Sequence, residues 1–273
     1  MIDAILQYNF LQNAILSIFL SSIICGIIGS IVIEKRLVMM SGGIAHTSFG
    51  GVGLGYWLGI EPIIGALLFA LLSALGVAGL KRKTNTRSDA IMGIFWSLGM
   101  ALGILFISFT PGYPPDVSSY LFGDILTVTG LDLKLMIILD IIVVSVIIMF
   151  FNYWKAYLFD AEFLTVKGIK TGLMEYLLFI LIALTVIVLI RVVGIVLVIA
   201  LLTAPPALAK LFTNNLKNMI LVSIILSLIF SLVGLSISYY YNIASGASII
   251  LITGSAYLIG AWGIKRDGKG VFL

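Results

Sequence analysis

Residues 174–212, MEYLLFILIALTVIVLIRVVGIVLVIALLTAPPALAKLF, contain two long apolar segments separated by the charged residue Arg191. A helix of about 20 apolar residues crosses the hydrocarbon core of a bilayer. The segments 174–190 and 193–212 are close to that length, so each predicts a membrane span. The whole chain has the same character, because 61% of its 273 residues are hydrophobic and 10% are charged. A soluble domain carries about a quarter charged residues. The sequence therefore predicts a polytopic membrane protein.

Similar apolar segments recur along the chain, and they predict an all-α protein with eight to nine transmembrane helices. Residues 1–273 then form a single transmembrane domain. The nine expected spans cover roughly residues 11–33, 38–59, 62–80, 90–110, 132–152, 174–190, 193–212, 218–240 and 246–263.

Basic residues indicate the orientation of these spans, since cytoplasmic loops carry an excess of Lys and Arg. With the N-terminus outside, all of the 16 Lys and Arg residues except Lys134 and Arg191 fall on one side. This asymmetry predicts a cytoplasmic C-terminus in a multi-pass protein of the cell membrane. It also explains the net charge of +4 without nucleic acid, which we exclude as a partner.

Three connections are longer than a turn, and the first is a short basic cytoplasmic loop from Lys81 to Asp89. Residues 111–131 form an external segment that begins with proline and is expected to include a short helix on or in the membrane. Its acid, Asp124, is a candidate for an entry path. Residues 153–173 form a cytoplasmic segment of mixed charge, which predicts a short amphipathic helix. Arg191, at the outer end of a span, is expected to extend to the lipid headgroups.

The single histidine of the chain, His46, lies inside the second predicted span. Ionisable groups within spans are costly and tend to mark transport pathways, and imidazole is a frequent ligand of transition metals. Residues four apart share one face of a helix, so Gly42, His46 and Gly50 line one ridge. Gly51, Gly55 and Gly59 form a second ridge of the kind that lets helices approach closely. His46 is therefore either a metal ligand or a hydrogen-bonding residue between helices.

Asp140 is the acid deepest in an apolar segment, in the middle of the fifth predicted span. A carboxylate there needs a cation, a metal, a water-lined cavity or a proton. Metal binding, proton binding and simple hydrogen bonding all remain open for it. Together with His46 it completes the set of candidate metal ligands. The single cysteine, Cys25, is expected to be a small buried hydrophobic residue.

Catalytic signatures are missing from the sequence. It has no GxxxxGK[ST] phosphate-binding loop, and one histidine cannot form an HExxH site. We therefore expect a protein without enzymatic activity and without a permanently bound cofactor.

An ordered set of motifs resembles the ABC-3 permeases, the membrane subunits of bacterial and archaeal zinc and manganese importers. The likeness covers roughly residues 11–263. The motifs that carry it are the glycine-rich segment 41–56 around His46, Ser88–Ile94, Leu121–Leu126, Phe159–Ile169, Val193–Lys210 and Ser245–Ala247.

The resemblance implies a homodimeric permease that imports zinc or manganese, with iron also open. It implies a separate ATPase subunit on the cytoplasmic side, with a coupling segment at about residues 158–172 seated in its cleft. An extracellular metal-binding protein would deliver the ion, and ATP would drive alternating access. A division of labour with a separate ATPase agrees with the missing phosphate-binding loop.

One position departs from the family pattern. Zinc and manganese members commonly have an aspartate four residues before this histidine, where the chain has Gly42. His46 would then need help from Asp140, from Ser41 or Met39, or from a second copy of the chain. Two alternatives remain open: a secondary carrier driven by an ion gradient through Asp140, and an ABC permease for a chelated metal or vitamin.

Overall fold

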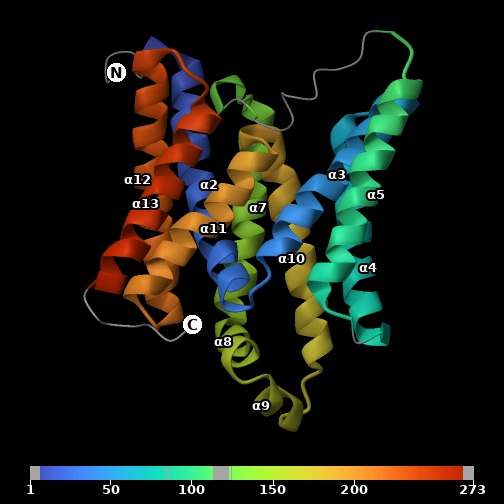
Figure 1. Ribbon diagram of the computed structural model, residues 1–273, viewed down its shortest axis with the longest axis vertical. Coiled ribbons are helices and arrows are strands. Elements are labelled where there is room, and N and C mark those ends of the chain that lie inside the picture. Colours follow the sequence, from blue (N-terminus) through green and yellow to red (C-terminus); the bar gives the residue numbers. More distant parts are fainter. Residues whose placement is uncertain (1–6, 85, 113–122, 124, 267–273) are drawn as a thin grey trace.

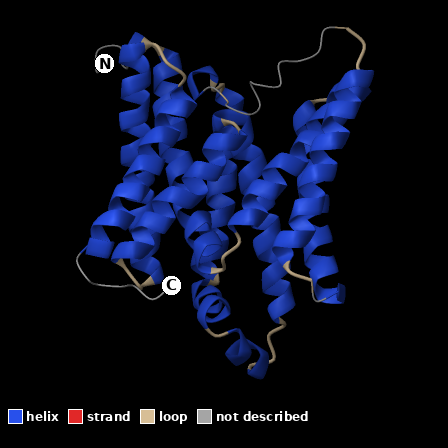
Figure 2. Cartoon of the chain, viewed as in Figure 1, coloured by secondary structure: helices blue, strands red, loops and turns tan. Residues whose placement is uncertain are grey.

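The chain is helical throughout the part that the structure describes. The computed structural model describes residues 7–84, 86–112, 123 and 125–266. Figure 2 shows helices joined by short loops, with no strand among these residues. The predicted all-α architecture is confirmed for these residues. Helices are expected physically, because long apolar segments in lipid satisfy their backbone hydrogen bonds only within a helix or a closed barrel.

Each predicted span overlaps one long helix. The long helices are α2 (Asn9–Glu34), α3 (Val38–Leu58), α4 (Pro62–Thr84), α5 (Ser88–Phe109), α7 (Gly130–Met149), α10 (Thr171–Val193), α11 (Ile195–Phe212), α12 (Leu216–Tyr241) and α13 (Ser245–Arg266). Three short helices complete the described chain: η1 (Ile125–Thr127), α8 (Phe151–Phe159) and α9 (Ala161–Val166).

Length and hydropathy identify fewer membrane crossings than there are long helices among the described residues. Seven of the described helices are long and apolar enough to cross a membrane alone, and α7 with α8 makes an eighth if the bent pair is one span. Helix α3 does not reach this hydropathy, because glycine, serine and threonine occupy much of it. The count of nine spans therefore stays a prediction.

The fifth predicted span, 132–152, is not one straight helix. Helix α7 ends at Met149, and α8 continues after a bend of 73°. The segment expected to be one amphipathic helix, 153–173, consists instead of the end of α8, the short helix α9 and the start of α10. The side chain of Asp160 caps α9 by accepting a hydrogen bond of 3.0 Å from the backbone N–H of Phe163.

The long helices gather in two groups joined by central helices. Figure 1 shows α2, α11, α12 and α13 on one side and α3, α4 and α5 on the other, with α7 and α10 between them. Helix α3 packs along both α4 and α5 and also contacts α10 and α11. It therefore connects the α4–α5 group to the rest of the bundle.

The two ends of the bundle are distinct. In Figure 1, α2 begins at the upper end, α13 finishes at the lower end, and α8 and α9 extend below the other helices. An odd number of membrane crossings places the start of the first helix and the end of the last helix on opposite sides of the membrane. The basic residues of the sequence assign the lower end to the cytoplasm, and this orientation stays a prediction.

Glycine brings α3 into backbone contact with its two neighbours. A Cβ at Gly51 would overlap the carbonyl of Gly65 on α4, and a Cβ at Gly65 would overlap the carbonyl of Gly51. On the other side, a Cβ at Gly53 would lie 2.5 Å from the carbonyl oxygen of Gly103 on α5. Small residues permit such close helix packing in membranes. The predicted role of Gly51 in helix packing is confirmed.

Candidate metal pathway

His46 lies in the middle of α3 and faces α5. Its imidazole stacks on the indole ring of Trp96, with ring centroids 4.3 Å apart and ring planes 5° from parallel. The side chain is half-buried, and its Nδ1 atom is buried without a hydrogen-bond partner among the described residues. Buried polar atoms are normally hydrogen-bonded, so an unpartnered nitrogen is available to an ion or to water.

Little on α3 itself supports His46 as a ligand. The hydroxyl of Ser41 donates a hydrogen bond of 2.9 Å to the carbonyl of Val38, so its proton is engaged within the helix. Met39 is exposed, with 43% of its surface accessible. Within the described ranges, no three His, Cys, Asp or Glu side chains could hold a metal ion together.

The Gly42 position has room for a side chain. A Cβ there would meet only the side chain of Ile199 on α11, with Cδ1 at 3.6 Å, which is an ordinary van der Waals distance. Gly42 differs in this respect from Gly43, whose Cβ would overlap the Met92 side chain on α5. The absence of an acid one turn before His46 is therefore not imposed by close packing.

Asp140 is buried in the middle of α7, and 7% of its surface is accessible. Neither carboxylate oxygen has a hydrogen-bond partner among the described residues. Helix α7 packs against α2 and α10. His46 packs instead at the α3–α5 contact. The two predicted ligands thus lie at different helix contacts, although α3 and α7 both contact α10.

The upper end of the bundle contains an ion pair that the sequence interpretation missed. Arg191 Nε, at the end of α10, lies 2.5 Å from Asp132 Oδ1 in the first turn of α7. Arg191 is therefore paired within the protein, and its expected reach to the lipid headgroups stays a prediction. Asp132 also takes part in a capping box with Thr129, and this TxxD spacing was the signal in the sequence that could have marked it.

The external segment meets the bundle at the same end. Gly123 has a positive φ of 58°, and a Cβ there would overlap the backbone of Val193 at the end of α10. Only a glycine lets the chain pass this close in that conformation. Within the predicted external segment 111–131, the structure describes one short helix, η1 (Ile125–Thr127). The candidate entry residue Asp124 lies outside the described residues.

The lower end of the bundle is rich in paired charges. Lys81 on α4 is paired with Glu175 on α10, and Lys210 on α11 lies 3.1 Å from Glu34 on α2. Burial lowers the pKa of Lys35, the residue after α2. The charge of Lys81 lowers the pKa of Lys35 further, and Glu175 acts in the opposite direction. These pairs connect α4 to α10 and α2 to α11.

Comparison with known proteins matches the chain to one family along almost its whole length. The sequence profile of the ABC 3 transport family covers residues 7–264. The membrane protein slr2045 of Synechocystis is 42% identical over 254 residues, which is 93% of this chain and 90% of that protein. The manganese transport system membrane protein MntC of Listeria monocytogenes is 33% identical over 258 residues, covering 94% of this chain and 92% of MntC.

Solved structures agree with the sequence comparison. PsaBC from Streptococcus pneumoniae, solved with a Fab, superposes with a TM-score of 0.84 at 33% identity, over 95% of this chain and 93% of that one. The chain is a permease of the ABC 3 transport family and a multi-pass protein of the cell membrane.

Proposed function

We propose that the chain is the membrane-spanning subunit of an ABC-type importer of a divalent transition metal, with manganese as the first candidate. The observation that carries this proposal is the end-to-end similarity to MntC, whose name states manganese transport. The manganese import permease ScaB of Streptococcus gordonii, at 35% identity over 94% of this chain, supports the same metal. Zinc and iron are the competing ions, because an imidazole alone does not discriminate among them.

His46 is the proposed contact for the ion within the membrane. Its buried Nδ1 atom has no hydrogen-bond partner among the described residues and can offer a lone pair to an ion. One neutral imidazole binds a divalent ion weakly, which allows the ion to leave again toward the cytoplasm. A second copy of the chain would supply further ligands if the pathway runs between two subunits.

Asp140 is proposed as the second polar group on the ion's route. Its two oxygens have no described hydrogen-bond partner, so its carboxylate needs a cation or a proton. Asp140 does not share a described ligand group with His46, so we assign it a separate step. Replacing it with asparagine, which keeps the shape and removes the charge, tests this assignment.

Helix α9 and the turns around it are the proposed coupling segment for the ATPase. It extends beyond the other helices in Figure 1, and Val166 at its end has 87% of its surface accessible. An apolar side chain so exposed at the end of a bundle is suited to a partner surface. We therefore propose that two copies of the chain each seat this segment, at about residues 158–172, in a separate ATPase subunit. An extracellular metal-binding protein would dock at the opposite end.

Reconstitution into proteoliposomes with the cognate ATPase tests the proposed function. Uptake of radioactive Mn²⁺ should require this chain, the ATPase and ATP. The variant His46→Ala should lower uptake by about tenfold or more, because removing a group that merely supports a ligand already costs that much in metal affinity. The variant Val166→Asp should leave the fold intact and separate ATP hydrolysis from uptake.

The controls separate the alternatives. Uptake that continues without the ATPase and disappears with the proton gradient would favour a secondary carrier that uses Asp140. Uptake that requires a chelator would favour a permease for a chelated metal. Unchanged Mn²⁺ uptake in His46→Ala would remove this residue from the pathway.

A further inference from the structure

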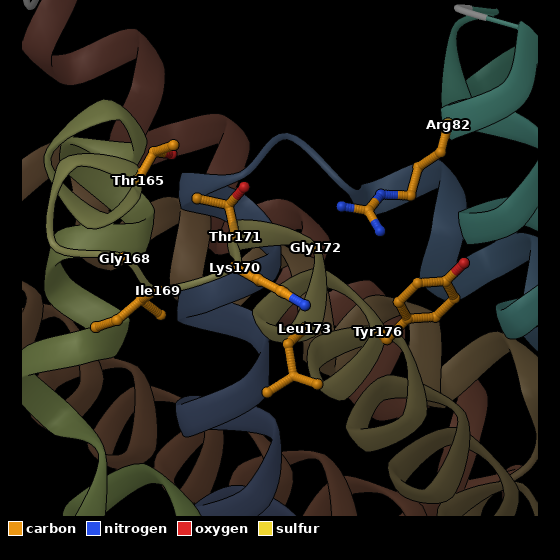
Figure 3. A pocket seen from close by; sticks show the side chains of 9 residues that line it. All are labelled: Arg82, Thr165, Gly168, Ile169, Lys170, Thr171, Gly172, Leu173 and Tyr176. Atoms are coloured by element: carbon orange, nitrogen blue, oxygen red, sulfur yellow. The ribbon is translucent and has the colours of Figure 1, made fainter.

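A pocket opens at the lower end of the bundle, between the end of α4 and the turn that joins α9 to α10. Its volume is about 510 Å³. Figure 3 shows Arg82 extending from α4 toward the first turn of α10, with Lys170 and Thr171 on the opposite side. Gly168, Ile169 and Leu173 are among the other residues that line it. A cavity of several hundred cubic ångströms is large enough for a small ligand.

Positive charge in this pocket exceeds negative charge. Neither Arg82 nor Lys170 belongs to any of the ion pairs found among the described residues. The nearby acid on α10, Glu175, is already paired with Lys81. An anion in the pocket would thus meet two cationic side chains without a competing carboxylate.

The position of Arg82 depends on a glycine. Its guanidinium lies against the α carbon of Gly172, where a Cβ would overlap it. On its other side the guanidinium carbon lies 5.6 Å from the centre of the Tyr176 ring, within cation–π range. Both contacts place the guanidinium of Arg82 beside the first turn of α10, at the edge of the pocket.

The surroundings of the pocket are those of a lipid site. It lies at the ends of two predicted membrane spans, and Leu173 in its lining has 70% of its surface accessible. Leu80, one turn inside α4, is also exposed at 42%. A phospholipid presents an anionic phosphate directly beside apolar chains, which matches this arrangement. Basic pockets between spans on the cytoplasmic side are known to bind such headgroups.

We propose that this pocket binds the headgroup phosphate of an anionic phospholipid of the cytoplasmic leaflet, with its acyl chains along the exposed sides of α4 and α10. The bound lipid would connect α4 to the α9–α10 turn. This inference does not depend on which metal the protein carries. Inorganic phosphate has the same chemistry without the chains. Thr165 and residues 168–172 of the lining also belong to the proposed coupling segment, so the ATPase is the competing macromolecule for this surface.

Native mass spectrometry of the purified full-length chain tests the proposal, with phosphatidylglycerol and phosphatidylcholine as the probes. The wild-type chain should retain phosphatidylglycerol preferentially. Arg82→Gln should weaken that retention about fivefold, as should Lys170→Gln, since each basic residue near a membrane surface contributes about that factor. Lys83→Gln is the matched control, because Lys83 is exposed at the same end of α4 but does not line the pocket.

A second variant keeps every charge and changes only the geometry. Gly172→Ala should displace the guanidinium of Arg82 and weaken retention of phosphatidylglycerol, although the net charge is unaltered. Size-exclusion chromatography of each variant confirms that the chain remains folded, and the readout needs neither metal nor ATP.

Four results would overturn the proposal. Equal retention of both lipids by the wild type would show no anion preference, and equal losses in Lys83→Gln would show diffuse attraction instead of a site. Displacement of phosphatidylglycerol by inorganic phosphate at millimolar concentration would identify a free-anion site. Unchanged lipid retention in Arg82→Gln, with loss of the co-purifying ATPase, would assign the pocket to that partner.

Discussion

The contact between α3 and α4 predicts a sharp difference between two glycines. A methyl group at Gly51 would overlap the carbonyl of Gly65, and a backbone carbonyl cannot rotate away as a side chain can. Overpacking of this kind costs about 1–3 kcal/mol. Alanine gains about 0.5–1 kcal/mol over glycine inside a helix. The upper part of the overpacking range applies here, because the carbonyl cannot move away. After the gain from alanine is subtracted, Gly51→Ala should lower the free energy of unfolding by about 2 kcal/mol.

Gly93 on α5 provides the matched control. It is exposed, and a Cβ there would have nothing within 4 Å, so Gly93→Ala keeps only the gain in helix propensity. In chains of this size each kcal/mol shifts the melting temperature by roughly 2–4 °C. Thermal unfolding of the purified chain in detergent should show Gly51→Ala lower by about 4–8 °C and Gly93→Ala unchanged or higher. Equal melting temperatures for the two variants would refute the reasoning.

Three further predictions concern the pathway and the upper ion pair. Gly42→Asp should place an acid one turn from His46 at little steric cost and strengthen Mn²⁺ binding, measured by calorimetry; unchanged affinity would show that His46 is not a ligand. Trp96→Phe should preserve Mn²⁺ uptake better than Trp96→Ala, because a stacked ring holds the imidazole; equal uptake in the two variants would exclude an orienting role. Arg191→Gln should destabilise the chain by about 1–3 kcal/mol in thermal unfolding, because it removes the partner of Asp132. The double variant Arg191→Gln, Asp132→Asn should be destabilised by less than the sum of the two single variants, and a destabilisation equal to that sum would mean that the ion pair contributes nothing.

Helix positions were the part of the fold that the sequence predicted best. The expected spans 38–59 and 193–212 correspond to Val38–Leu58 and Ile195–Phe212. The end of α4 at Thr84 was missed, because Lys81, Arg82 and Lys83 extend the helix beyond the apolar segment. Hydropathy reports where lipid contact ends, and a helix can continue into water after that point.

The bend after α7 had no clear signal in the sequence. The residues around Phe150 include neither proline nor glycine, which are the usual causes of a sharp change of direction. The aromatic side chain of Trp154 is fully buried after the bend, so packing of α8 under the bundle accompanies the change of direction. Such a contact involves residues distant in sequence and leaves no periodic pattern.

The candidate site was predicted in part. His46 and Asp140 were identified because an ionisable group in an apolar segment is exceptional wherever it occurs, and the structure places both on long helices with unpartnered polar atoms. The stacking partner Trp96 could not be identified in this way, since an aromatic residue in an apolar segment is ordinary. Whether His46 and Asp140 contact the ion stays a prediction.

The sequence by itself determined that this protein lies in a membrane, where its helices run and which polar residues stand out, because each of these depends on the local preference of a segment for lipid or water. Only the tertiary structure decided which helix faces are in contact. The stack of His46 on Trp96, the pair of Asp132 with Arg191 and the placement of Arg82 over Gly172 all depend on the rotation and register of separate helices. Hydropathy does not encode the rotation and register of helices, because in lipid most faces of an apolar helix are equally soluble. Close packing between particular residues decides which faces are in contact.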